Sequence, residues 1–168
     1  MSIPLNVIKT EKERVSGVPV NVATPFNSGD MMKWDAANQV ATPIVAGDAA
    51  SAAAAALFIG VSNDTNPMRG GIGNVSIPRI AIITRALVQF VADDNAVYNP
   101  GDAVTFGADP QKIRHAAASG TNVIGYVAPE NFFPMNAGGT AAVGITAVAG
   151  VTPIQINLRP QYTQLTTI

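Results

Sequence analysis

The only imidazole that could act as a general base or metal ligand belongs to His115. A Ser-His-Asp system needs a nucleophilic serine beside it, and the Gly-x-Ser-x-Gly turn that often carries that serine is absent from the sequence. His115 closes an expected strand, and the adjacent Arg114 disfavours protonation of the ring. We therefore expect a surface or hydrogen-bonding histidine rather than a catalytic one.

Four side chains with oxygen donors, Asp93, Asp94, Asn95 and Asp102, could gather around a hard cation. Their spacing matches no calcium loop, and the bidentate glutamate of the helix–loop–helix pattern is missing, so turns are the expected structure. Glu130 is the only glutamate after residue 14, which excludes a paired-glutamate site and leaves only aspartate pairs open. With no cysteine present, thiolate chemistry is excluded. We expect no enzyme activity, no cofactor and no metal.

A glycine-rich run, Gly70-Gly71-Ile72-Gly73, looks superficially like a phosphate-binding loop. Such a loop needs a helix directly after it, with its N-terminus toward the phosphate. Here residues 74–78 follow, with the sequence Asn-Val-Ser-Ile-Pro, which is typical of a strand. A β-turn is the expected structure of this run.

Composition limits the classes of partner. Charged residues make up 12% of the chain, about half of the roughly 25% in ordinary soluble domains, so we expect partners to cover much of the surface. The basic residues are scattered and the net charge is −1, which argues against nucleic acid. The most apolar stretch, residues 49–61, is too short to span a membrane. Residues 1–14 hold no apolar core of signal-peptide length, so we expect no secretory signal and synthesis in the cytoplasm.

Strand signals dominate after residue 28. Segment 77–92 is rich in β-branched residues and is predicted to form a strand, with Ile80, Ile82, Val88 and Phe90 on one face and Arg79, Arg85 and Leu87 on the other. Further strands are predicted within 122–127, 141–148 and 153–158. The predicted core contains Trp34, Ile80, Ile82, Val88, Phe90, Phe106, Ile124 and Ile156. Short strands separated by turns rich in glycine and proline indicate a mainly β fold, a compact small barrel or sandwich.

Two segments stand apart from this pattern. An N-cap residue, Asp48, precedes an alanine run, so we expect one short helix within 46–57, with a loop over 49–56 as the alternative. Residues 1–28 contain a mixed charge run and three prolines, and we expect them to form an extended N-terminal arm before a β domain over 29–168. An edge strand with a frayed end is the alternative. As an arm, the segment offers apolar side chains to a protein partner or a neighbouring subunit: Ile3, Leu5, Val7, Ile8, Val18, Val20 and Val22.

The sequence also echoes itself. Residues 29–36, which begin Gly-Asp and contain Trp34, match residues 101–108, which begin Gly-Asp and contain Phe106. Downstream, Ile59-Gly60-Val61 matches Ile124-Gly125-Tyr126. Each copy holds an aromatic that can anchor a core and a glycine that permits close backbone approach. We therefore expect two related turn-strand units, with chance similarity of two hairpins as the alternative.

These features resemble the head-decoration, or cement, proteins of tailed bacteriophages. The residues that carry the resemblance are the turn and strand of 101–106, Ile113, the strand of 123–127 and the alternating strand of 154–159. The resemblance covers residues 73–159, and it extends to 29–62 through the echo. It implies a non-enzymatic virion protein that binds the major capsid protein on the outer surface of the expanded shell, as a homotrimer, and stabilises the shell.

Two other classes of protein stay open. One is another virion part, such as a subunit of a tail tube, head fibre or adhesin. The other is a small sugar-binding or hydrolytic β domain, which would need a small-molecule ligand that we do not expect.

Overall fold

The computed structural model describes residues 13–48, 57–64, 78–109, 111–116, 123–129 and 144–159, and within these ranges the chain is mainly β. The elements are β1 Glu13–Pro19, β2 Met31–Asp35, β3 Val40–Pro43, the 3-10 turn η1 Ala46–Asp48, β4 Phe58–Ser62, β5 Arg79–Arg85, β6 Leu87–Val91, β7 Val97–Tyr98, β8 Ala103–Phe106, β9 Ile113–His115, β10 Gly125–Val127, β11 Ile145–Thr146 and β12 Pro153–Leu158.

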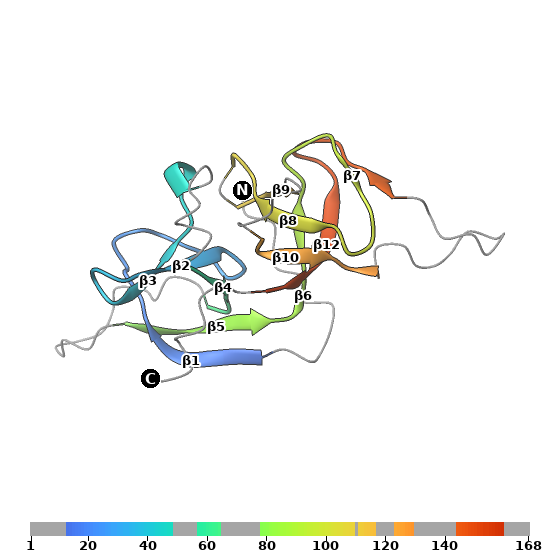
Figure 1. Ribbon diagram of the computed structural model, residues 1–168. Coiled ribbons are helices and arrows are strands. Elements are labelled where there is room, and N and C mark those ends of the chain that lie inside the picture. Colours follow the sequence, from blue (N-terminus) through green and yellow to red (C-terminus); the bar gives the residue numbers. More distant parts are fainter. Residues whose placement is uncertain are drawn as a thin grey trace.

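The strands form two five-stranded antiparallel sheets and a small two-stranded one (Figure 1). The first sheet has the order β1-β5-β4-β2-β3, and the second has the order β6-β12-β10-β8-β9. Counted in chain order within each sheet, both orders are first, fifth, fourth, second, third. The small sheet pairs β7 with β11. The two large sheets therefore share one strand plan.

The segment predicted as one long strand, 77–92, is divided between the sheets, and the prediction of a single strand was wrong. In Figure 1, β5 runs into β6 as a nearly continuous green ribbon, but β5 belongs to the first sheet and β6 to the second. The chain crosses at Ala86, whose carbonyl accepts a hydrogen bond from the Leu158 N–H at 3.1 Å. Because strands on both sides of the crossing alternate, the sequence pattern alone does not show the break.

Each large sheet curls so that the strand at one edge approaches the strand at the opposite edge. Val20, just after β1, forms a single parallel bridge with Ala41 on β3, and Ala92, just after β6, forms the matching bridge with Ile113 on β9. One bridge does not make a closed sheet, and no closed barrel is found among the described residues.

The predicted arm forms part of the first sheet where the structure describes it. β1 pairs with β5 as an edge strand, so the edge-strand alternative holds for Glu13–Pro19 and the arm prediction was wrong there. The pairing follows from the alternating pattern of residues 17–22. The described part of the predicted helix is the 3-10 turn Ala46–Asp48, while residues 49–56 lie outside the described ranges.

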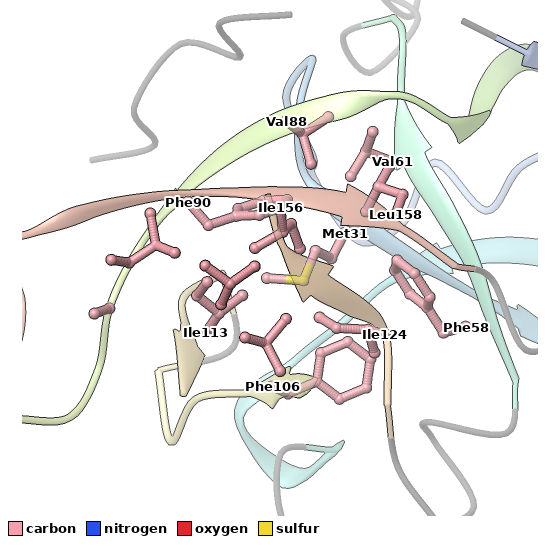
Figure 2. Packing of buried hydrophobic residues seen from close by; sticks show 14 of the residues in the cluster. Met31, Phe58, Val61, Val88, Phe90, Phe106, Ile113, Ile124, Ile156 and Leu158 are labelled. Carbon is pink, nitrogen blue, oxygen red and sulfur yellow. The ribbon is translucent and has the colours of Figure 1, made fainter. Parts of the chain in front are cut away.

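Two hydrophobic clusters stabilise this arrangement. The small core lies inside the first sheet and contains Trp34, Ile59, Ile80 and Ile82. The shared core lies between the sheets: Met31, Phe58 and Val61 of the first sheet meet Phe106, Ile124, Ile156 and Leu158 of the second (Figure 2). Ile83 of the first sheet belongs to the same cluster. The rings of Phe58 and Phe106 meet edge to face at 5.6 Å. All eight residues predicted to be core are buried, which confirms that prediction.

Corresponding turns hold the two sheets in the same way. Gly29 and Gly101 both have positive φ, and each N–H donates to the last residue of the fourth strand of its own sheet: to the Ser62 carbonyl of β4 at 2.7 Å and to the Val127 carbonyl of β10 at 2.9 Å. In both turns the aspartate after the glycine accepts a hydrogen bond from an asparagine N–H three residues earlier. The residues that the sequence matched therefore occupy corresponding places.

Candidate functional site

The single histidine, His115, ends β9, and its ring reaches the turn that precedes β8. His115 Nε2 is 3.1 Å from Asp102 Oδ2, and its Nδ1 is 3.0 Å from the Ala116 carbonyl, so both ring nitrogens have partners. Burial raises the pKa of Asp102, but hydrogen bonds from the backbone and side chain of Asn99 and from His115 outweigh this effect, and the pKa falls below its ordinary value. The prediction of a hydrogen-bonding histidine is confirmed.

The other acidic side chains around this turn also bind protein groups. Asp94 accepts from the Tyr98 hydroxyl at 2.6 Å and from the His115 N–H at 2.9 Å. Burial and the bond to Asp94 together raise the pKa of Tyr98 well above its ordinary value. Asp93 accepts from the N–H groups of residues 108 and 109. In the part of the chain that the structure describes, no three histidine, cysteine or acidic residues gather where a metal ion could bind.

The predicted partner-contacting residues fall into two groups. Val18 and Val20 are 1% and 2% exposed and lie in the small core, and Val22 packs against it. The side chains of Val18 and Val20 are therefore covered by the chain's own core, whereas Val22 is only partly buried and its contact with a partner stays a prediction. Ile3, Leu5, Val7 and Ile8 lie outside the described residues, so their partner contact stays a prediction, as do the structures of Gly70–Gly73 and Glu130.

Among the described residues, a hollow of about 410 Å³ lies beside the point where the chain crosses between the sheets and is a candidate binding site. We call it the crossover groove, and it is lined by Arg85, Ala86, Leu87, Tyr126, Asn157, Leu158 and Arg159. The end of β5, the start of β6, β10 and the end of β12 position these side chains. Antiparallel pairing places Asn157 opposite both Tyr126 and Leu87.

The groove is lined by buried apolar residues and by more exposed polar ones. Ala86, Leu87 and Leu158 are buried, whereas Asn157 and Arg159 are exposed and Tyr126 is half-buried. The Arg159 guanidinium lies over the Tyr126 ring, 5.4 Å from its centroid, a cation–π contact that holds both side chains in place. Tyrosine and arginine are the residues enriched where proteins bind proteins, so this surface is suited to a protein partner.

The second arginine of the groove is held more loosely. Arg85 Nη1 lies 3.2 Å from Glu13 Oε1, and both side chains are mostly exposed. An exposed ion pair of this kind contributes at most about 1 kcal/mol, because water screens the charges and two long side chains lose freedom. Arg85 can therefore exchange Glu13 for a carboxylate of a partner at little cost.

The sequence contained a signal for this groove that composition and motifs did not reveal. Arg85 directly ends β5 and Arg159 directly follows β12, the fifth strands of the two sheets in chain order. Had the echo been extended to these strands, it would have paired the two arginines. The two arginines line the same groove because the chain crosses between the sheets at Ala86, and the sequence did not predict that crossing.

No model of a known protein family matches the chain, and no curated protein matches it. Among the described residues, no helix has the length and apolar character needed to cross a membrane.

Proposed function

We propose that this chain is a structural protein of a tailed-phage virion, a decoration protein that binds the outer surface of the expanded capsid and stabilises it. The observation that carries the proposal is the repeated plan of the two sheets. The Gly-Asp turn and the Ile-Gly strand, on which the resemblance to decoration proteins rests, recur at corresponding places in both. We further propose that the chain is a compact sandwich-like pair of related units.

The surface of the second sheet supports a binding role. The crossover groove offers Tyr126 and two arginines, and Val97, Val148 and Val151 expose apolar side chains around β7 and β11. By contrast, His115, Asp94 and Asp102 are bound to one another or to the backbone. This distribution favours contact with a protein surface over catalysis.

The proposed mechanism is stabilisation linked to binding. A protein that binds only the expanded shell lowers the free energy of that state by RT ln(1 + [L]/Kd) at every site. If the chain assembles as a homotrimer, as the resemblance implies, three modest contacts act together and gain avidity. The major capsid protein is the proposed partner.

Co-sedimentation with empty shells of the phage that carries the gene tests this proposal. Purified protein is mixed with expanded shells and, as the control, with unexpanded shells of the same capsid protein. We expect saturable, stoichiometric binding to expanded shells and a higher temperature for their disruption. Absence of binding to expanded shells above the level of a non-cognate protein would contradict the proposal.

A further inference from the structure

The place of the crossover groove in the repeated plan suggests what it does. In the first sheet, Val61 on β4 and Ile83 on β5 point into the shared core, where the second sheet packs against them. The corresponding residues of the second sheet are Tyr126 on β10 and Asn157 on β12, and both line the groove. The groove therefore occupies the part of the second sheet that in the first sheet receives another β unit.

A second copy of the chain cannot fill this place in the way that the second sheet fills it on the first. The packing surface of the second sheet, which includes Phe106 and Ile124, is already buried against the first. The inner surface of the first sheet is covered by Val18, Val20 and Phe26. No equivalent face is left on a copy among the described residues, so the occupant has a different structure.

Charge indicates the chemistry of that occupant. Two guanidinium groups, from Arg85 and Arg159, border the groove, and none of its lining residues is acidic. Glu13 neutralises Arg85 only through an exposed contact, and Arg159 pairs with no carboxylate among the described residues. A guanidinium presents a planar fork of N–H donors that fits a carboxylate, and the Asn157 amide beside it can bond to a peptide backbone.

The same features disfavour nucleic acid as the occupant. Strong binding to a phosphate backbone needs many cationic contacts, and single strands also need aromatic faces on which bases stack. The groove has two arginines, and one face of Tyr126 is covered by Arg159. A short protein segment that carries a few carboxylates matches this surface better than a polyanion does.

We infer that the crossover groove binds an acidic segment of the protein partner, with Arg85 and Arg159 gripping its carboxylates and Asn157 its backbone. This inference rests on the proposed function and names the part of the partner that the chain recognises: an extended stretch of the shell protein bearing aspartate or glutamate.

An NMR titration of the full-length ¹⁵N-labelled protein tests the inference. The probe is a short acetylated oligoglutamate peptide, and the matched oligoglutamine peptide is the control. We expect saturable shifts of the backbone amides of Ala86, Leu87, Tyr126 and Leu158 with the acidic peptide alone, and affinity that falls as salt is added. Shifts spread over the surface without saturation, or equal shifts with both peptides, would overturn the inference.

Substitutions then assign the charges. Arg85→Gln with Arg159→Gln should weaken peptide binding by roughly tenfold or more, because two charge-assisted contacts are lost. Arg114→Gln, on β9 and away from the groove, is the matched control and should bind like the unaltered protein. Unchanged affinity of the double variant for the peptide would overturn the inference. So would an oligothymidylate that perturbs the same amides and binds with higher affinity than the peptide.

Shell binding by the same variants separates this inference from the proposed function. We expect the double variant to lose at least about tenfold in affinity for expanded shells while Arg114→Gln keeps its affinity. Equal shell binding by the double variant and the control would overturn the groove inference and leave the decoration function standing. If the unaltered protein binds the acidic peptide in the groove but not the shells, the decoration function fails instead.

Discussion

The two large sheets have the same strand order and matching turns, yet the outer face is buried in the first sheet and exposed in the second. On the first sheet, Val61 and Ile83 are buried beneath the second sheet. On the second sheet, Tyr126 and Asn157 occupy the same places and remain at the surface. One backbone plan thus supports both a buried packing face and an exposed groove, and the side chains at a few outward positions decide which of the two forms.

The inner faces, by contrast, are conservative between the sheets. Trp34 and Phe106 occupy corresponding positions on β2 and β8, and Ile82 and Ile156 do so on β5 and β12. All are buried because an aromatic and branched aliphatic side chains fill the concave side of each curled sheet. At these positions the two sheets carry side chains of the same kind, whereas their outer faces carry different ones.

The largest effect is expected from the aromatic that joins the sheets. Phe106→Ala should lower the free energy of unfolding by roughly 3–5 kcal/mol, since it empties part of the shared core and removes the contact with Phe58. Because that core belongs to both sheets, urea unfolding followed by circular dichroism and by fluorescence of the single tryptophan, Trp34, should give coincident transitions. The exposed Val151→Ala should change stability by less than about 0.5 kcal/mol.

Separate transitions for the two probes in Phe106→Ala would contradict the claim that the two sheets share one core, because the sheets would then fold as independent units. A loss below about 1 kcal/mol would show that Phe106 does not anchor the core.

The two glycines of the Ile-Gly strands should rank in a defined order. A Cβ on Gly60 would lie 2.2 Å from the Ile83 carbonyl oxygen, and φ there is +132°, whereas a Cβ on Gly125 would lie 2.6 Å from the Asn157 carbonyl oxygen. Both substitutions force backbones apart. We expect Gly60→Ala to destabilise by roughly 2–4 kcal/mol and Gly125→Ala by roughly 1–3 kcal/mol, measured by chemical unfolding.

Gly101→Ala is the control for that pair, because no atom lies within 4 Å of its Cβ and only the positive φ of +85° opposes the side chain. It should destabilise by roughly 1–2 kcal/mol. If glycine-to-alanine changes were neutral at both residue 60 and residue 125, the close approach of these positions to the backbone of the neighbouring strand would be contradicted.

A smaller effect on stability is expected from the aspartates of the matching turns, Asp30 and Asp102, whose pKa values shift in opposite directions. Burial raises the pKa of Asp30, with a weaker opposing bond from Asn27, whereas hydrogen bonds lower the pKa of Asp102 despite its burial. Charged Asp102 therefore stabilises the fold at neutral pH, and this contribution disappears as pH falls through its folded pKa. The contribution of Asp30 has the opposite sign: it is present when the group is protonated and is lost as pH rises through its raised pKa.

Urea midpoints measured between about pH 3 and pH 7 follow from these signs. Asp102→Asn should cost roughly 1 kcal/mol at neutral pH, and the difference from the unaltered protein should shrink on acidification. Asp30→Asn should be neutral or slightly stabilising at neutral pH, with the advantage lost below the ordinary aspartate value of 3.8. Parallel pH profiles for the two variants would contradict the assigned environments.

The sequence predicted the β class, the buried residues and the paired turns, because each depends on local alternation or on a Gly-Asp pair such as Gly101-Asp102. It did not predict the crossing at Ala86, since strand alternation continues through it from Arg85 to Leu87. It also assigned Val18 and Val20 to a partner, because a valine pattern shows that a strand buries one face but not against what. The sequence did not predict the groove, because its lining residues come from strands that are far apart in the sequence and meet only in the folded chain.

The central claim, that the chain decorates a capsid through the second sheet, is tested most directly by cryo-microscopy of the particle that carries it. We predict density for the two curled sheets on the outside of the expanded shell, grouped in threes, with Tyr126, Arg85 and Arg159 against an acidic segment of the major capsid protein. Density inside the shell, in the tail, or absent from the particle would contradict the claim.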